Sequence, residues 1–456
     1  MTLGLVEGKL AESRVEDPVF REVKAGDSLR LGCFDVSFFA VNHSIPGSLG
    51  LFLRSPAGTI LHTGDFKLDQ TPIDGVTTDF AALTRFGQEG VDLMFSDSTN
   101  ADNPNFTKSE AEVGKVLDSI IKNAPRRVIV ASFASHIHRM QQVCNAAIAA
   151  HRKIVVTGRS MLTNIRIAMD LGYLSVPEGS IIDAYEAKDI PPEQVVVLCT
   201  GSQGEPLSAL ARMASGEHRT IQIEEGDTVI ISATPVPGNE KAVTRVVNGL
   251  SKIGAKVYDK SKALVHVSGH AGSEELKLVL TMVRPRYFMP VHGEAMHLRA
   301  HARLAEEVGV PKQNIFVMEN GETLVMHRHE VERGEAVQSG IVYVDGLSVG
   351  DTNQIVLRDR KVLANDGFCA VAILIDSKTQ QPAGDIELIL RGVTGGDEKA
   401  LLDDAHAVIQ EALRKATSQR GVRTSHVQRD VRDALSKFLW DRCHRRPMII
   451  PVVMEI

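Results

Sequence analysis

The sequence predicts an α/β protein followed by a small α+β domain, and three observations support this class. Short apolar strands alternate with amphipathic helices over residues 107–262, which is typical of a parallel sheet covered by helices. Hairpin-like strands at 49–53 and 59–62 flank a Ser-Pro-Ala-Gly turn and indicate a mixed sheet before that segment. Beyond a predicted hinge near 343–350, two apolar strands and two amphipathic helices precede a last strand at 448–454.

Composition places few restrictions on function. The chain has 456 residues, enough for two or three domains, and its 43% hydrophobic and 24% charged residues are ordinary for a globular protein. A net charge of -6 means that nucleic acid would have to bind in a local cleft. The five cysteines form no C-x-x-C pair and favour a reducing cytoplasm, and no apolar run is long enough to predict a membrane partner.

Two helix starts are informative. Residues 2–10 read as a helix with Leu3 and Val6 on one face and no N-cap residue before it, so either this is a short, frayed first helix or the chain begins inside a domain. Thr107, with Glu110 three residues later, predicts a capping box and a helix that starts there.

Titratable side chains follow several predicted strands. His43, Asp65, His270 and His292 each stand just after an apolar run. A lone histidine in such a place is more often structural, and Asp65 in Thr-Gly-Asp is usually a turn residue. However, one hairpin separates His43 from Asp65, so both should lie at one sheet edge. Imidazole nitrogen and carboxylate oxygen suit Zn²⁺ or Mn²⁺, and an aspartate can bridge two such ions.

Other polar corners favour phosphate. Ser268 and the N–H groups around Gly269 precede a helix expected near Ser273, so they could form an anion-binding turn, and His270 belongs there too. The corners at 132–139 and 200–205 favour contact with phosphate or nucleobase. His136 and His138 would point to different faces of a helix, which argues against one shared metal. No Walker A or G-x-G-x-x-G sequence supports a nucleotide cofactor.

Five further histidines are expected on solvated faces: His266, His297, His301, His327 and His329.

Seven ordered motifs together resemble bacterial ribonuclease J, of the β-CASP branch of the metallo-β-lactamase fold. The motifs are Val-Asn-His-Ser-Ile-Pro (41–46), His-Thr-Gly-Asp-Phe-Lys (62–67), Ser-Asp-Ser-Thr-Asn (96–100), Ala-Ser-Phe-Ala-Ser (131–135), Cys-Thr-Gly-Ser-Gln-Gly-Glu-Pro (199–206), Val-Ser-Gly-His-Ala (267–271) and Pro-Val-His-Gly-Glu (290–294). The resemblance implies an αββα sandwich split by an inserted β-CASP domain, and a C-terminal dimerisation domain. The implied domains are 1–106 (first part of the sandwich, N-terminally incomplete), 107–262 (β-CASP), 263–345 (second part of the sandwich) and 346–456 (linker and α+β domain).

The resemblance also implies site residues and an activity. His43, Asp65 and His292 correspond to zinc ligands of a two-zinc site, with Asp65 bridging, and Asp65, Asp97 and His270 to the catalytic group. The implied contacts to RNA phosphate are His266, Val267, Ser268, Gly269 and His270, with Ser135 and His136. The implied activity is 5′-to-3′ exonuclease with endonuclease action in RNA and rRNA maturation and decay, in the cytoplasm. The implied partners are RNA, a homodimer or homotetramer, and other RNA-decay proteins.

One departure from the family shapes the alternatives. The His-x-His-x-Asp-His cluster of the family occurs nowhere in the sequence. Since a catalytic zinc takes about three protein ligands, weak metal binding and impaired turnover are expected. The first hypothesis is a ribonuclease J whose N-terminal part is missing. The second is a non-catalytic RNA-binding or regulatory paralogue, and a weaker third is a metallo-hydrolase of a small phosphoester.

Overall fold

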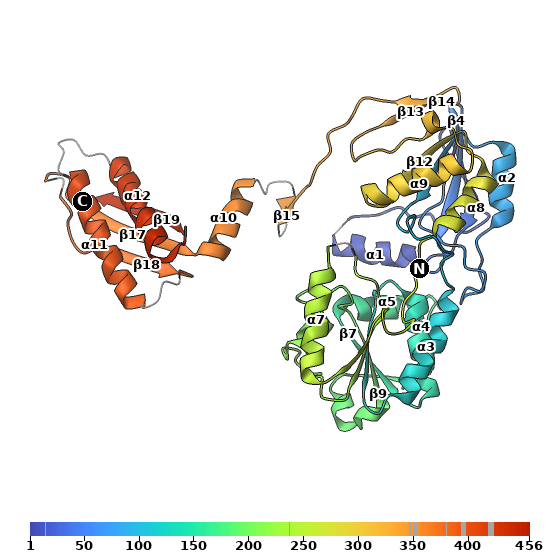
Figure 1. The fold of residues 1–456 in the computed structure, drawn as a ribbon, viewed down its shortest axis with the longest axis horizontal. Coiled ribbons are helices and arrows are strands. Elements are labelled where there is room, and N and C mark those ends of the chain that lie inside the picture. Colours follow the sequence, from blue (N-terminus) through green and yellow to red (C-terminus); the bar gives the residue numbers. More distant parts are fainter. Residues whose placement is uncertain are drawn as a thin grey trace. The chain divides into compact units, whose positions relative to one another are not determined.

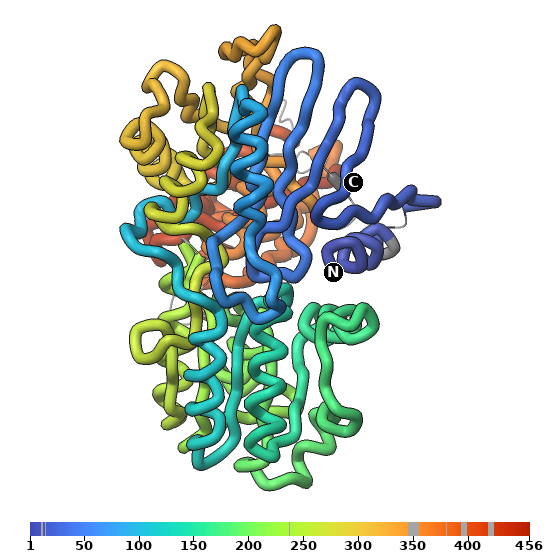
Figure 2. The backbone as a smooth tube through the Cα atoms, turned by 90° about the vertical axis from the view of Figure 1, so that its right-hand side faces the viewer, coloured from blue at the N-terminus to red at the C-terminus, as the bar shows by residue number. Residues whose placement is uncertain are grey.

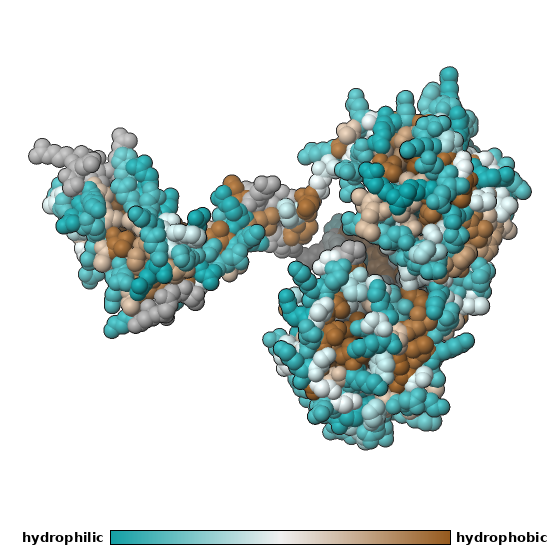
Figure 3. All heavy atoms as spheres, viewed as in Figure 1, coloured by the Kyte–Doolittle hydropathy of each residue, from teal (hydrophilic) through white to brown (hydrophobic). Residues whose placement is uncertain are grey.

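The structure of the chain is a computed structural model, and it forms two compact units, residues 1–338 (unit 1) and 339–456 (unit 2). It describes residues 1–13, 15–236, 238–345, 348–349, 354–379, 381–393, 398–417 and 424–456. Of the predicted hinge at 343–350, residues 346, 347 and 350 lie outside the described residues. On the face seen in Figure 3, hydrophobic side chains are interspersed among hydrophilic ones.

The first sheet of unit 1 is mixed. Its strands follow the order β1-β2-β3-β4-β5-β12, with antiparallel pairs up to β4 and parallel pairs from β4 to β12. The bounds are β1 Ser28–Leu31, β2 Phe34–Ala40, β3 Leu49–Ser55, β4 Gly58–His62, β5 Leu93–Asp97 and β12 Tyr287–Val291. The predicted hairpin is therefore confirmed. Neighbours β5 and β12 are far apart in the sequence, which makes the intervening part an insertion (Figures 1 and 2).

Both faces of the first sheet are covered. On one face, Phe52, Leu61 and Met94 pack with three helices in a continuous core. These helices are α2 Phe80–Glu89, α8 Ser273–Val283 and α9 Ala295–Glu307. On the other face, Leu93 and Tyr287 pack against the hairpin of β13 Leu324–His327 and β14 Glu330–Arg333.

The inserted part, from α3 to β11, contains a second sheet that is entirely parallel. Its strand order is β11-β10-β6-β9-β7-β8. The strands are β6 Val128–Ala131, β7 Lys153–Thr157, β8 Ile181–Ile182, β9 Val195–Cys199, β10 Thr228–Ile231 and β11 Lys256–Tyr258. Fully buried runs of β-branched residues in β6 and β9 are what a sheet covered on both faces requires.

Helices cover both faces of the second sheet. Helices α3 Glu110–Asn123, α4 Ile137–Ala149 and α5 Arg159–Asp170 supply one core, and α6 Ala209–Ala214 and α7 Glu240–Ile253 supply the other. Helix α1 Thr2–Glu12 packs against α5. Three short 3-10 turns complete the unit: η1 Glu186–Asp189, η2 Pro192–Gln194 and η3 Lys312–Asn314.

Unit 2 is a helix-covered sheet with order β18-β17-β19. Alternate residues of β17, among them Val371 and Ile373, are buried against two helices. The elements are β15 Val344–Asp345, β16 Ser348–Val349, α10 Gln354–Asp366, β17 Phe368–Ile375, β18 Glu387–Arg391, α11 Glu398–Thr417, α12 Thr424–Cys443 and β19 Met448–Glu455. The predicted α/β class with an additional α+β domain is confirmed. Among the described residues, no helix combines the length and apolarity that a membrane crossing needs.

Two local predictions are wrong. Helix α3 starts at Glu110 and is capped by Ser109, whose hydroxyl accepts from the N–H of Ala111, so Thr107 is not the cap. The hydroxyl of Thr107 instead donates to the carbonyl of His270, at 2.8 Å. His301 is fully buried rather than solvated, because α9 presses it against Phe288 of β12.

Candidate active site

Parallel pairing brings three polar strand ends of the first sheet together. Strand β5 lies between β4 and β12, and its last residue, Asp97, pairs in register with Val291. The next residue after Val291 is His292, and Asp65 follows β4 by three residues. The carboxyl ends of neighbouring parallel strands therefore place Asp65, Asp97 and His292 at one sheet edge.

The turn after β4 brings Asp65 toward His43. Gly64 has φ +66° and lies so close to the carbonyl oxygen of Leu49 that a Cβ would sit 2.8 Å from it. Only glycine combines that dihedral angle with that contact. The result is a separation of 4.0 Å between His43 Nε2 and Asp65 Oδ2.

His43 itself is held from the opposite side. Its Nδ1 lies 2.9 Å from the carbonyl oxygen of Gly269, and a Cβ on Gly269 would sit 2.8 Å from the imidazole ring. Burial lowers the pKa of His43, although the Gly269 carbonyl and the nearby carboxylates oppose this. A neutral imidazole is the form that can bind a metal.

His292 adopts a left-handed backbone conformation, with φ +55°. Ser98 N–H and the Thr99 hydroxyl both donate to the His292 carbonyl, at 3.2 and 3.0 Å, and hold this conformation. Such a conformation in a non-glycine residue is uncommon and costs on the order of 1–3 kcal/mol, so it is frequent at functional sites.

Asp97 connects the histidines. Its side chain is only 2% exposed, and its Oδ2 lies 2.6 Å from His270 Nδ1 while its Oδ1 lies 3.3 Å from His292 Nδ1. Burial would raise the pKa of Asp97, but the hydrogen bonds from His270 and His292 outweigh it and hold the pKa well below the usual value. Asp97 is thus an ionised carboxylate that orients two imidazoles.

His292 Nδ1 is surrounded by oxygen atoms. Asp65 Oδ1 lies at 3.1 Å, Thr99 Oγ1 at 3.1 Å and Asp97 Oδ1 at 3.3 Å from this one nitrogen. The hydrogen bond to Asp97 raises the pKa of His292, and the charge of Asp65 adds to the effect. The surroundings therefore favour positive charge at this point.

The donor set fits one divalent cation. The candidate ligand atoms of Asp65, His270 and His292 all lie within 4.8 Å of one another, and His43 reaches the second oxygen of Asp65. Imidazole nitrogen with carboxylate oxygen is the ligand chemistry of Zn²⁺. Since a catalytic zinc takes about three protein ligands, His43, Asp65 and His292 suffice for one ion rather than two. The structure groups two of the predicted ligands, Asp65 and His292, with His270, and it places the third predicted ligand, His43, 4.0 Å from Asp65.

The predicted phosphate segment forms a turn over this edge. The hydroxyl of Ser268 accepts from the N–H of His270, at 3.1 Å, and the ring of His270 packs between those of His43 and His292. Val267 is buried, and Ser268 is partly exposed. Ser268, Gly269 and His270 therefore lie next to the candidate metal ligands His43 and His292.

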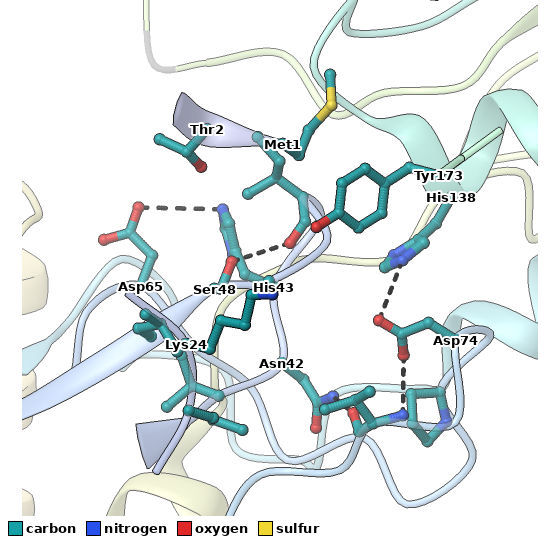
Figure 4. A pocket seen from close by; sticks show the side chains of 18 of the residues that line it. Met1, Thr2, Lys24, Asn42, His43, Ser48, Asp65, Asp74, His138 and Tyr173 are labelled. Atoms are coloured by element: carbon teal, nitrogen blue, oxygen red, sulfur yellow. Dashed lines mark hydrogen bonds and ion pairs between the residues drawn. The ribbon is translucent and has the colours of Figure 1, made fainter. Parts of the chain in front are cut away.

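A cavity of about 590 Å³ opens beside His43 and Asp65. Figure 4 shows these two side chains on one side and the ion pair of His138 with Asp74 on the other. His138 Nε2 lies 3.4 Å from Asp74 Oδ2, and this hydrogen bond lowers the pKa of Asp74. The cavity thus lies between the first sheet and the inserted part.

A buried ion pair at the start of the inserted part was not predicted. Arg139 is fully buried, and its guanidinium donates to both carboxylate oxygens of Glu110, at 2.6 and 2.8 Å. It also donates to the carbonyl of Val265, at 2.8 Å, and to Ser232. Sequence reasoning assigned Glu110 to a capping box, and no local pattern marks an arginine as buried.

The predicted RNA contacts of the inserted part differ in exposure. Ser135 is exposed, whereas His136 is buried, accepts from the N–H of Arg139 at 3.4 Å and lies 3.6 Å from Glu110. Burial lowers the pKa of His136 to about 4 and that of His266 to about 3. Ser135 is therefore accessible in a way that His136 is not.

Three segments of the chain match models of known protein families. Residues 125–250 match the family model described as "Ribonuclease J, beta-CASP domain", residues 254–318 the "Zn-dependent metallo-hydrolase RNA specificity domain" and residues 355–456 the "Ribonuclease J C-terminal domain".

Curated relatives match over essentially the full chain. A ribonuclease J of Mycolicibacterium smegmatis is 44% identical over 100% of this chain and 81% of its own length. A ribonuclease J of Thermus thermophilus is 42% identical over 100% of this chain and 78% of its own length. Ribonuclease J2 of Bacillus subtilis is 39% identical over 100% and 82%.

Proposed function

The chain belongs to the ribonuclease J family, and from this premise we propose that it acts on RNA as a 5′-to-3′ exonuclease with additional endonuclease activity. The family and its metallo-hydrolase domain support a metal-dependent ribonuclease. We further propose zinc as the metal and RNA maturation and decay, including that of rRNA, as the setting. The described cysteines are all free thiols, which suits a reducing cytoplasm.

The observation that carries the proposal is the cluster of Asp65, Asp97, His270 and His292 beside the turn at Ser268. It combines a cation site, an ionised carboxylate and donors for phosphate within one sheet edge. His43, Asp65 and His292 would hold the cation. When bound, a divalent cation supplies Lewis-acid stabilisation of the charge that develops on a phosphodiester.

The remaining residues have separate tasks. The proton on His270 Nδ1 is held by Asp97, at 2.6 Å, so Nε2 is the free atom that can give a proton to a leaving oxygen or receive one. A low pKa keeps Asp97 ionised and fixes that tautomer. Ser268, the N–H groups of residues 266–269 and the exposed Ser135 would bind RNA phosphates, with His266 and His270 beside them. His136 is buried, so it would support these phosphate-binding residues indirectly, through its hydrogen bond with the N–H of Arg139.

A second function is favoured by the small ligand set. The sequence contains no His-x-His-x-Asp-His, and three candidate ligands fit one ion. We therefore propose that this 456-residue polypeptide binds metal weakly and turns over slowly. The alternative is a non-catalytic RNA-binding or regulatory paralogue, which would bind RNA without cleaving it.

One experiment separates the two. The purified polypeptide is incubated with a 5′-monophosphorylated RNA and Zn²⁺ or Mn²⁺, and released mononucleotides are measured. Activity that falls at least tenfold in Asp65→Asn, but not in the matched control Asp102→Asn on an exposed position, supports the nuclease. RNA binding with no release above an EDTA blank supports the paralogue. Neither binding nor release would reject both.

The outer face of the sheet in unit 2 supports the proposed homodimer or homotetramer. Ile389, Ile450, Val452 and Met454 alternate with the residues that face the helices, and each is more than 40% exposed. An apolar sheet face of this kind is typical of a protein interface. Other RNA-decay proteins are further candidate partners.

A further inference from the structure

The fully buried carboxylate of Glu275 makes contacts that its own helix does not explain. Glu275 is the third residue of α8, and its Oε2 accepts from the N–H of Gly272, the N-cap, at 2.7 Å. This is half of an ordinary capping box. The other two contacts leave the helix. Oε1 accepts from Leu68 N–H and Oε2 from Thr107 N–H, both at 2.7 Å.

The three donors belong to three loops that each lead to the candidate active site. Leu68 lies three residues after Asp65, and Gly272 lies two residues after His270. Thr107 lies in the loop between Asp97 and α3, two residues before the cap of that helix. A single side chain with 0% exposure therefore joins the loops after β4 and β5 to the start of α8.

The backbones of these loops pack closely against one another. Ser273 N–H donates to the carbonyl of Asn103 at 2.8 Å, and a Cβ on Gly272 would lie 1.9 Å from the carbonyl oxygen of Asn105. Thr107, whose N–H is held by Glu275, also donates from its hydroxyl to the carbonyl of His270, at 2.8 Å. Asn100 donates to the same carbonyl at 3.3 Å. Each backbone contact sets the position of His270 relative to the loop after Asp97.

Both side-chain oxygens of Glu275 are satisfied by these donors. None of the ion pairs among the described residues includes Glu275, so backbone N–H groups are its stabilising partners. A buried carboxylate is stable when it accepts several such bonds. Because both oxygens are in use, a neutral isostere cannot accept all three.

We propose that Glu275 is a positioning residue that holds the loops of Asp65, Asp97 and His270 in the arrangement that binds RNA phosphate. It acts through the backbone and does not touch the RNA. The relevance to RNA rests on the proposed function, whereas the positioning of the loops does not.

The first test is hydrogen exchange on the full chain. Glu275→Gln keeps the shape but presents an NH₂ group to backbone N–H donors. We expect exchange at residues 66–70, 105–109 and 270–274 to become at least tenfold faster in this variant. Asp227→Asn is the control for the loss of a buried carboxylate away from the site, because Asp227 is also fully buried and accepts from the N–H of Glu224, although it pairs with Arg126 and Arg127 as well. It should leave these three segments unchanged. Faster exchange confined to 270–274 would reduce Glu275 to a helix cap and overturn the proposal.

The second test measures binding of a 5′-monophosphorylated RNA oligonucleotide in EDTA by fluorescence anisotropy. We expect Glu275→Gln to weaken binding about tenfold and Asp227→Asn to leave it unchanged. Thr107→Val, which removes the contact with the His270 carbonyl, should weaken binding, and Thr107→Ser should restore it. Unchanged affinity in Glu275→Gln overturns the proposal. If the unmodified chain does not bind the RNA, the proposed function fails, and the exchange experiment still decides the positioning role.

Discussion

Replacing Arg139 by methionine should destabilise unit 1 strongly, because it leaves a buried carboxylate without its cation. Arg139 is fully buried, and the side chain of Glu110 is 8% exposed. The guanidinium donates to both oxygens of Glu110 and to two backbone carbonyl groups. Removing one partner of a buried ion pair costs about 3–5 kcal/mol. We therefore expect Arg139→Met to lower the free energy of unfolding by about that amount at pH 7.

The effect should depend on pH in a direction that identifies the cause. Burial would raise the pKa of Glu110, but His136 and Arg139 outweigh it and keep the pKa below the ordinary value of 4.5. In the unmodified chain Glu110 therefore contributes stability above about pH 4.5, and this is lost as pH falls through the lower folded pKa. Without Arg139, burial has less opposition and the folded pKa rises. Protonation of Glu110 then removes the unpaired buried charge in Arg139→Met. The loss in its free energy of unfolding should therefore be smaller at pH 5 than at pH 7.

A double replacement and the replacement of a second buried arginine serve as controls for Arg139→Met. Glu110→Leu with Arg139→Met removes both charges and should recover at least about 1 kcal/mol, since apolar replacement of a buried pair is often neutral. Arg152 is also buried, but its guanidinium donates to the carbonyl groups of Arg126 and Ala124, and no ion pair among the described residues includes it. Arg152→Met should cost about 1–3 kcal/mol with no pH dependence between 5 and 7.

Urea unfolding followed by far-ultraviolet circular dichroism measures these differences. The only tryptophan of the chain, Trp440, lies in unit 2, so its fluorescence transition should not move in any of the variants. Equal costs for Arg139→Met and Arg152→Met at both pH values would show that the ion pair does not determine the stability of this region.

Three further predictions address other sites. Burial lowers the pKa of His301 to about 3, so the unfolded chain takes up its proton first and stability is lost as pH falls from about 6.5 towards 3. His301→Gln should reduce that slope by up to about 1.4 kcal/mol per pH unit in urea titrations at pH 7, 6 and 5, and an unchanged slope would contradict the burial argument. Gly272→Ala should destabilise the chain, because its Cβ would lie 1.9 Å from a carbonyl oxygen. Gly8→Ala, at a helix position with open space around it, should stabilise the chain by up to about 1 kcal/mol. Thermal melts that rank the two variants in the reverse order would refute this. Val452→Glu on the exposed sheet face should convert the proposed oligomer to a monomer in light scattering, with the Trp440 transition retained.

The candidate site could be predicted only where chemistry is local. A strand followed by a polar residue is visible in the sequence, and that is how Asp65 and His292 were found. The supporting contacts were missed because they join distant residues. The hydroxyl of Thr107 contacts a carbonyl 163 positions away, which removes it from the capping role that its neighbours suggest. His301 looked solvated because nothing in the local sequence reveals the packing of α9 against β12.

Two buried carboxylates divide the organisation of this site between them. Asp97 accepts from the rings of His270 and His292 and from the N–H groups of Phe66 and Thr99, whereas Glu275 accepts from three backbone N–H groups that include those of Thr107 and Gly272. Asp97 can orient a ring only if the backbone that carries the ring is already placed. A change at Glu275 should therefore disturb the contacts of Asp97, while a change at Asp97 should leave residues 105–109, which Glu275 holds through Thr107, in place. Hydrogen exchange in Asp97→Asn, compared with Glu275→Gln, measures this asymmetry: fast exchange at residues 105–109 in both variants would mean that the two carboxylates form one cooperative network instead.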